Sequence, residues 1–205
     1  MRRFEARYRG ARSLQAHFLE RYWEGGKIVR VDAGMVYFRH PNRMRWEYEA
    51  PEVKLFVSDG RTIWFYVPAD RTAMRSTLKE DADERTPFAL LTGNPRVARL
   101  CGSVVLGPPA EAVTPGNQVL HCRLRGTKAA PQAAAEILLE IVPESGDLSR
   151  VRVEQGGGAA IEFQFSKWEK NTAGNEAQFH FTPPVGVAIV NAPADGSAAE
   201  SSLPR

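Results

Sequence analysis

Long apolar runs are missing from this sequence of 205 residues. No stretch approaches the roughly 20 apolar residues that a membrane-spanning helix needs. The opening residues 1–5, MRRFE, also lack the apolar segment of a secretory signal. The chain is therefore either cytoplasmic or a mature form from which a signal was removed, and its composition leaves both possibilities open.

Cysteine is scarce, with Cys101 and Cys122 as the two examples. Their spacing fits no zinc or redox motif. One disulfide between them would close a loop of roughly 20 residues and contribute about 3 kcal/mol. The alternative is that both cysteines are buried thiols. We slightly prefer this alternative, although the sequence is compatible with both. The histidines show no metal-ligand spacing and are scattered: His17, His40, His121 and His180.

Catalytic motifs are also missing. We find no nucleophile elbow, Walker loop, HExxH, or GxGxxG after a strand. The acidic cluster at 80–84 lies in a charged linker, KEDADER, where a solvated loop is the usual explanation. We therefore expect no enzymatic activity and no metal site.

Charge of one sign is not concentrated in this chain, whose net charge is +3. Arg43 and Arg45 lie near aromatic residues that could stack on bases. Glu47 and Glu49 interrupt that same strand face, so we do not expect nucleic-acid binding.

Short alternating runs dominate the rest of the chain. Phe4, Tyr8 and Ala11 share one face of a predicted first helix. About ten or eleven short strands follow, separated by turn signals such as Asp59-Gly60, with an expected bend at Gly34 and a last strand carrying Phe179 and Phe181. This regular spacing predicts an antiparallel barrel or a strongly curved sheet.

Large apolar side chains occupy the presumed inner faces of these strands: Met44, Trp46, Tyr48, Trp64, Tyr66, Phe163 and Phe165. They form either a solid core or the wall of an apolar cavity. A helical segment that starts at Thr86-Pro87 favours the cavity, because it could act as a lid through Phe88, Leu90 and Leu91. Burying each of these would contribute about 1.5–3 kcal/mol, which an acyl chain can match at about 0.8 kcal/mol per CH2.

Five short sequence motifs occur in an order and spacing that resemble those of a known protein family. They are GMVYFRHPNRMRWEYEAP at 34–51, VSDG at 57–60, WFYVP at 64–68, TPFALL at 86–91 and FHFTPPVG at 179–186. In this order and spacing they resemble the LolA family of outer-membrane lipoprotein carriers, from about Leu14 to Val187. Residues 102–136 align with nothing in that family that we recognise.

The resemblance implies a mainly β fold, an unclosed antiparallel barrel of about eleven strands with a helical lid. It implies a periplasmic carrier of acylated lipoproteins, loaded by an ATP-driven inner-membrane release complex and unloaded at an outer-membrane acceptor, without a cofactor. We expect one monomeric domain over 1–190 and a disordered tail over 191–205. The alternative is a regulatory module of the cell envelope that senses lipoproteins or lipids through the same pocket and acts on a protein partner.

Two positions depart from the family pattern. The resemblance places the latch of the lid at His40, where the family has arginine, and Arg39 lies one residue earlier. A one-residue offset in a strand points to the opposite face, so Arg39 would substitute only if a bend re-aims it. A histidine latch would be weaker and sensitive to pH. Met44 stands where the family has an aromatic residue, and it makes a softer wall.

Overall fold

The computed structural model describes residues 2–77, 97–125, 136–172 and 176–191, which form one large sheet with short helices at its margins. None of the helices in these ranges is long and apolar enough to cross a membrane. The elements, in chain order, are α1 Arg2–Arg9, β1 Ser13–Glu24, β2 Lys27–Arg39, β3 Arg43–Ala50, β4 Lys54–Ser58, β5 Thr62–Val67, β6 Thr72–Thr77, α4 Val97–Leu100, β7 Cys101–Leu106, η1 Pro109–Glu111, β8 Gln118–Leu124, β9 Glu136–Ile141, β10 Leu148–Gly156, β11 Ala159–Lys170, η2 Glu176–Phe179 and β12 Ala188–Asn191.

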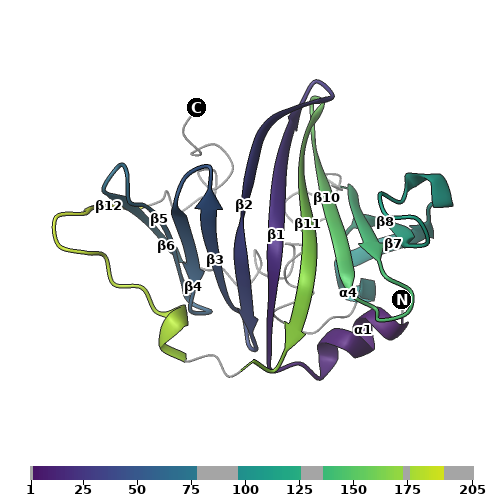
Figure 1. Ribbon diagram of the computed structural model, residues 1–205, viewed down its shortest axis with the longest axis horizontal. Helices are drawn as coiled ribbons and strands as arrows, with labels where there is room; N and C mark the ends of the chain where they lie inside the picture. Colours follow the sequence, from purple (N-terminus) through teal and green to yellow (C-terminus); the bar gives the residue numbers. More distant parts are fainter. Residues whose placement is uncertain (1, 78–96, 126–135, 173–175, 192–205) are drawn as a thin grey trace.

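The sheet has twelve strands in the order β12-β6-β5-β4-β3-β2-β1-β11-β10-β9-β8-β7. All neighbours are antiparallel except β12, which pairs in parallel with β6. The sheet ends at β12 on one side and at β7 on the other, so it does not close on itself (Figure 1). The expected unclosed, mainly antiparallel architecture is confirmed, and β12 is the strand that exceeds the expected number.

One face of this sheet carries the core, and we call it the inner face. Directly paired residues in neighbouring strands share a face, so the pairs Leu14–Phe38 and Ala16–Val36 place all four side chains there. All four are buried. The predicted first helix is confirmed as α1, whose Phe4 packs against the same core at the lower end of the sheet in Figure 1.

The expected bend at Gly34 is present. The β2–β3 pairing shifts register between Ala33 and Gly34, as in a β-bulge. A Cβ atom at Gly34 would lie 1.8 Å from the carbonyl oxygen of Glu47. The two backbones therefore approach each other more closely here than any side chain permits.

Cys101 and Cys122 form a disulfide between β7 and β8, with their Cα atoms 5.4 Å apart. Our preferred interpretation, two buried thiols, is wrong in its chemistry, although both residues are buried. The register explains the bond, because Cys101 pairs with Leu124, and Cys122 lies two residues away on the same face of β8. The bond thus ties the last strand of the sheet to its neighbour.

Reducing this disulfide is expected to destabilise the protein. The bond closes a loop with a sequence separation of 21, which contributes about 3 kcal/mol in the chain-entropy model. Denaturant unfolding with and without a reductant measures the difference. A Cys101→Ser, Cys122→Ser double variant serves as the control, because its stability should match that of the reduced protein and ignore the reductant. Equal stability of oxidised and reduced protein would contradict the expectation.

The C-terminal part of the chain differs from the expected last strand. Phe179 ends the short helix η2 and is buried, while the ring of Phe181 packs on Trp64 and Tyr66. Alternating aromatic residues indicated a strand here, but Pro183-Pro184 cannot donate to a ladder. The last strand is instead β12 at the sheet edge, and residues 192–205 of the predicted tail lie outside the described residues.

Candidate functional site

An apolar stripe runs along the inner face across the middle of the sheet. Phe38, Val36 and Gly34 of β2 pair with the predicted site residues of β3, which are Met44, Trp46 and Tyr48. Phe18 of β1 pairs with Phe165 of β11, and Glu20 pairs with Phe163, so the two predicted residues of β11 lie on this face as well. The structure therefore brings five of the seven predicted wall residues together.

The rings of this stripe pack against one another. Trp46 lies 4.9 Å from Phe18, 5.3 Å from Phe163 and 6.2 Å from Phe165, measured between ring centroids. These four side chains are at most 7% exposed. Edge-to-face and tilted contacts at such distances stabilise a pair by about 0.5–1.5 kcal/mol beyond the buried area. Whether these residues bind a ligand stays a prediction.

Trp64 and Tyr66, the other two predicted wall residues, lie on the opposite face of the sheet, and their assignment to the same wall is wrong. Ser58 pairs with both Met44 and Ile63, so Ile63 follows the inner face and Trp64 does not. Trp64 and Tyr66 instead hold the ring of Phe181, with centroids 5.6 and 5.3 Å apart. The strand 62–67 is apolar at nearly every position, so alternation could not reveal its inner side.

The predicted lid residues Phe88, Leu90 and Leu91 lie outside the described residues, so the lid stays a prediction. Arg39, one of the two predicted latch residues, is on the outer face, where its guanidinium lies 3.3 Å from the carboxylate of Glu176. Arg39 precedes His40 by one residue, and the alternation of the strand predicts this outward orientation. The bend at Gly34 does not turn the Arg39 side chain to the inner face. His40 is exposed at the turn after β2.

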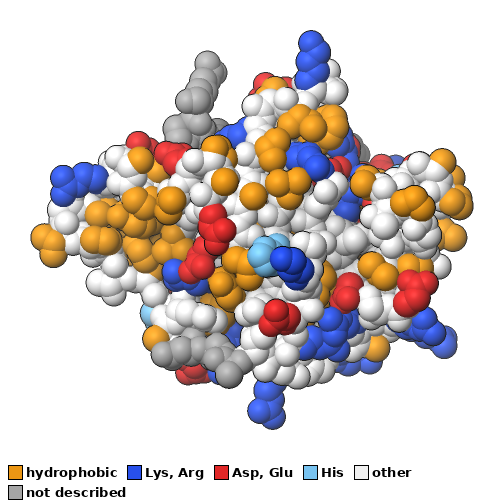
Figure 2. All heavy atoms as spheres, viewed as in Figure 1, with side chains coloured by type: hydrophobic (Ala, Val, Ile, Leu, Met, Phe, Trp, Pro, Cys, Tyr) orange, Lys and Arg blue, Asp and Glu red, His pale blue; other side chains and the backbone are white. Residues whose placement is uncertain are grey.

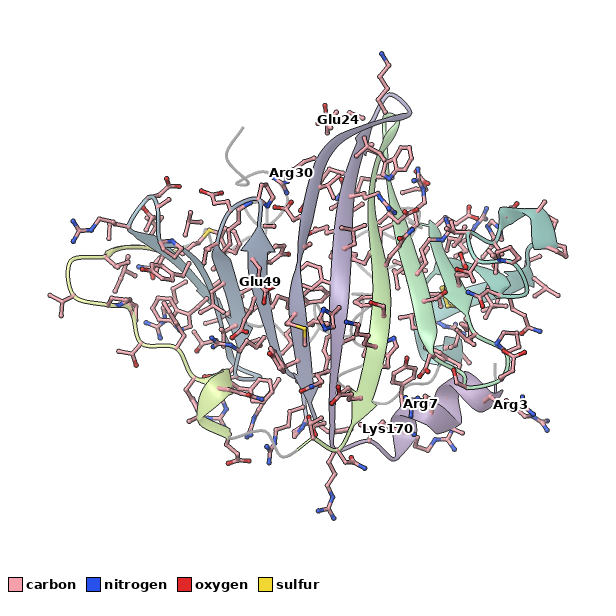
Figure 3. The ribbon with its side chains drawn as sticks, in the orientation of Figure 1. Arg3, Arg7, Glu24, Arg30, Glu49 and Lys170 are labelled. Atoms are coloured by element: carbon pink, nitrogen blue, oxygen red, sulfur yellow. A yellow bond between two sulfur atoms is a disulfide. The ribbon has the colours of Figure 1, made fainter. Side chains whose placement is uncertain are left out.

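A polar cluster interrupts the inner face above the apolar stripe, and the sequence analysis missed it. Its members come from four neighbouring strands: Glu20, Tyr22, Arg30, Asp32, Tyr48 and Lys54. Glu20 pairs with Asp32, and Tyr22 pairs with Arg30, which Figure 3 labels at the upper end of β2. Extending the alternation of Leu14, Ala16 and Phe18 by two more steps would have placed Glu20 and Tyr22 on the inner face.

Asp32 is the anionic centre of the polar cluster and is 1% exposed. Its carboxylate lies 3.2 Å from the ammonium of Lys54 and 2.8 Å from the guanidinium of Arg30. The Arg30 guanidinium also stacks on the ring of Tyr22, 3.7 Å from its centroid. The buried anion is thus compensated by two cations, as burial of a charge requires.

Glu20 has no such cationic contact among the described residues and is 2% exposed. Burial raises the pKa of its carboxyl group above the ordinary value of 4.5. Hydrogen bonds from the hydroxyls of Tyr22 and Tyr48 and the charge of Arg30 lower the pKa, the charge of Asp32 raises it, and the net shift is upward. Glu20 therefore holds its proton at a higher pH than an exposed glutamate does.

Glu20→Gln is expected to make the protein more stable at neutral and alkaline pH. Because the pKa of Glu20 is raised in the folded state, its contribution to stability is full below about pH 4.5 and is lost as the pH rises through the raised pKa. The glutamine variant has no proton to lose. Urea unfolding of both proteins across this range measures the divergence. Glu49→Gln, on the exposed part of β3 labelled in Figure 3, is the control, and parallel curves for Glu20→Gln and the wild type would contradict the expectation.

The outer face holds a buried ion network of its own. Arg150 lies 2.8 Å from the carboxylate of Glu140 and 3.3 Å from that of Glu162, and its guanidinium donates to the carbonyl oxygen of Glu111 at 2.9 Å. Glu140 also accepts hydrogen bonds from the backbone N–H groups of 113 and 114. This network fastens the segment after β7 onto the sheet, which is a structural role.

Figure 2 shows the surface of the molecule in the orientation of Figure 1. Basic and acidic side chains are interspersed on this face, and apolar side chains gather over β4 to β6 and over the upper part of the central strands. A nucleic-acid site is typically a basic stripe, and this face has no such arrangement among its described residues.

Comparison with known proteins gives a family match. The family model described as outer membrane lipoprotein carrier protein LolA matches residues 9–182 of this chain. The outer-membrane lipoprotein carrier protein of Photobacterium profundum is 29% identical over 171 residues, which cover 80% of this chain and 74% of that protein. The protein of the same description from Nitrosospira multiformis is 28% identical over 188 residues, which cover 88% and 83%.

A solved structure also resembles this one. It is an uncharacterized conserved protein from Thermus thermophilus, with a TM-score of 0.56 and 15% identity, over 93% of this chain and 96% of that protein. At this identity the likeness concerns the fold alone.

Proposed function

Because this chain belongs to the LolA family of outer membrane lipoprotein carrier proteins, we propose that it carries lipoproteins by holding their acyl chains against the inner face of its sheet. The observation that supports this most is the apolar stripe around Trp46, which is continuous across β3, β2, β1 and β11. In this role the protein needs no cofactor and performs no reaction.

The energetics support a reversible site. A sixteen-carbon acyl chain gains on the order of 12 kcal/mol when all its CH2 groups leave water, at about 0.8 kcal/mol each. Burying one large side chain contributes about 1.5–3 kcal/mol. An acyl chain can therefore replace the contacts that a few side chains of the stripe make with one another, and those contacts can form again when the ligand leaves.

We place the protein in the periplasm, the compartment of this family's carriers. In the proposed cycle an ATP-driven inner-membrane complex loads it with a lipoprotein, and an outer-membrane acceptor removes the lipoprotein. A disulfide such as Cys101–Cys122 suits that oxidising compartment. In this proposal bulky ligands enter and leave on the unclosed side of the sheet, where the two end strands β12 and β7 do not pair with each other.

Trp46→Glu is expected to abolish acyl binding, because an ionised carboxylate in the stripe would have to be buried against the chain at a cost of several kcal/mol. Affinity should fall by roughly a hundredfold or more. Displacement of a fluorescent apolar probe by a triacylated peptide measures it. Trp64→Glu is the matched control, since it makes the same substitution on the opposite face and should bind like the wild type. Equal losses in both variants, or none in Trp46→Glu, would contradict the assignment.

A second readout covers the case in which Trp46→Glu does not fold. Bromine atoms on an acyl chain quench the fluorescence of tryptophans that they approach. Trp168 also packs on the stripe, 5.3 Å from Phe165 between ring centroids, so the test uses a Trp168→Phe background. In that background Trp46→Phe should remove most of the quenching, and Trp64→Phe should remove little. The opposite pattern would place the ligand on the outer face and overturn the proposal.

The sensing alternative differs from carriage in one measurable step. A carrier moves an acylated peptide from donor to acceptor vesicles, and the rate of transfer rises with carrier concentration. A protein that binds the peptide and yet transfers none of it would sense its ligand, and carriage would be excluded.

A further inference from the structure

The polar cluster lies where the apolar stripe ends, on the same face of the same strands. Tyr48 belongs to both, since its ring is 5.0 Å from Phe18 while its hydroxyl hydrogen-bonds Glu20. Phe163 pairs with Glu20 across β1 and β11. A ligand that lies along the stripe therefore reaches the cluster without leaving the inner face.

Some buried polar atoms of the polar cluster make no hydrogen bond with the described residues. The Oε2 atom of Glu20 is buried and has no hydrogen-bond partner among the described residues. The Nε atom of Arg30 and the Oδ2 atom of Asp32 face each other as an ion pair, but neither makes a well-aligned hydrogen bond. Nearly all buried polar atoms in proteins have partners, so such a group requires an explanation. In a binding face, the explanation is a partner that the ligand supplies.

The charges of the cluster select the kind of ligand group. Arg30 and Lys54 are the two cations, and Asp32 balances one of them. Glu52, 3.5 Å from the ammonium of Lys54, balances the other. With Glu20 protonated, the sum is zero, which favours an uncharged acceptor over a phosphate or a free carboxylate. A protonated carboxyl group is a donor to such an acceptor, and the hydroxyls of Tyr22 and Tyr48, which donate to Glu20, hold that carboxyl group in place.

We propose that Glu20, with Tyr22 and Tyr48, forms a subsite for the ester and amide carbonyls that link acyl chains to a lipoprotein. Asp32, Arg30 and Lys54 position these groups, and together with Glu52 they keep the subsite neutral. The inference rests on the proposed function and adds a direction to it, because the linkage lies at the upper end of the inner face and the acyl chains run down the stripe. A carrier built in this way recognises acyl esters and not merely hydrocarbon.

Two ligands with identical chains test the subsite. One is a peptide with a dipalmitoyl ester of glyceryl-cysteine, and the other is its dialkyl ether analogue, which lacks the chain carbonyls. The wild type should bind the ester roughly three- to tenfold more tightly, the value of about one hydrogen bond. Glu20→Leu should bind both ligands alike, with the affinity for the ether unchanged. Glu20→Gln retains a donor and should keep the preference.

The outcomes separate the subsite from the carrier role. The subsite is overturned if the wild type binds ester and ether equally, or if Glu20→Leu loses affinity for both ligands. In either case the wild type still binds acyl chains, so the proposed function stands. Wild type that binds neither ligand overturns the proposed function, and the subsite with it. Should Glu20→Leu fail to fold, the infrared band of a 13C-labelled ester decides, since binding to the wild type must shift it to lower frequency. The matched control Glu49→Leu removes an exposed carboxylate of β3 and should leave both affinities unchanged.

Discussion

Gly34→Ala is expected to destabilise the protein by about 3 kcal/mol or more, since overpacking against atoms that cannot move is among the costlier substitutions. The added Cβ would lie 1.8 Å from the carbonyl oxygen of Glu47 and 2.9 Å from its carbonyl carbon. Both are backbone atoms in the β2–β3 ladder, so relief requires the strands to separate. The midpoint of urea unfolding should fall accordingly.

Gly10→Ala is the matched control for this substitution. A Cβ at Gly10 meets nothing within 4 Å, so the alanine variant should be as stable as the wild type or slightly more so. A Gly34→Ala protein with an unchanged midpoint would show that β2 and β3 do not approach each other as closely as the structure has them.

Arg150→Met should cost about 3–5 kcal/mol at neutral pH, because it leaves the carboxylate of Glu140 buried without its cation, while Glu162 keeps its ion pair with Arg21. The loss depends on pH. Burial raises the pKa of Glu140. Hydrogen bonds from Thr114, Asn117 and Val113 and the charge of Arg150 together lower this pKa by more than burial raises it, so the pKa lies below its ordinary value.

The lowered pKa fixes the sign of the pH effect. The stability that Glu140 contributes is present above its ordinary pKa and is lost as the pH falls through the lowered value. The gap between wild type and Arg150→Met should therefore be widest at neutral pH and should narrow in acid. Thermal unfolding at several pH values measures the gap.

Two controls accompany Arg150→Met. The double variant that adds Glu140→Gln should recover part of the loss, since it removes the buried carboxylate that has lost its cation. Arg123→Met, on the exposed outer face of β8, should change stability by less than about 0.5 kcal/mol. A constant gap at all pH values would mean that Arg150 stabilises the fold by packing and not by charge.

Much of the fold could be predicted from alternation alone. The first helix, the strands up to β6 and the bend at Gly34 follow from local patterns, because each depends on residues close together in the chain. Met44, Trp46 and Tyr48 were placed on one face for the same reason. The inner position of Phe163 and Phe165 followed likewise from a clean alternation in β11.

Features set by pairing between strands could not be predicted in this way. The face of Trp64 depends on the register across two hairpins, and its strand gives no alternation to follow. The disulfide depends on β7 and β8 lying side by side. Glu20 was overlooked because a charged residue in an alternating strand usually belongs to the solvent side. The alternation of Leu14, Ala16 and Phe18 does place Glu20 inside when it is extended along β1, and the hydroxyls of Tyr22 and Tyr48 explain how a carboxyl group is accommodated there.

The position of β1 has a consequence for how the chain folds. β1 is the first strand to be made, yet it lies in the middle of the sheet between β2 and β11. Its pairs with β11 run from Trp23–Ala160 to Leu14–Lys170, so 137 to 156 positions separate the partners. Such distant pairings are slow, because the entropy of closing the chain is lost before any contact forms. Until β11 is made, a half-sheet of β1 to β6 has two unpaired edges, at β1 and at β6, because β12, the partner of β6, is made later still. We expect this intermediate to be the species most prone to aggregate.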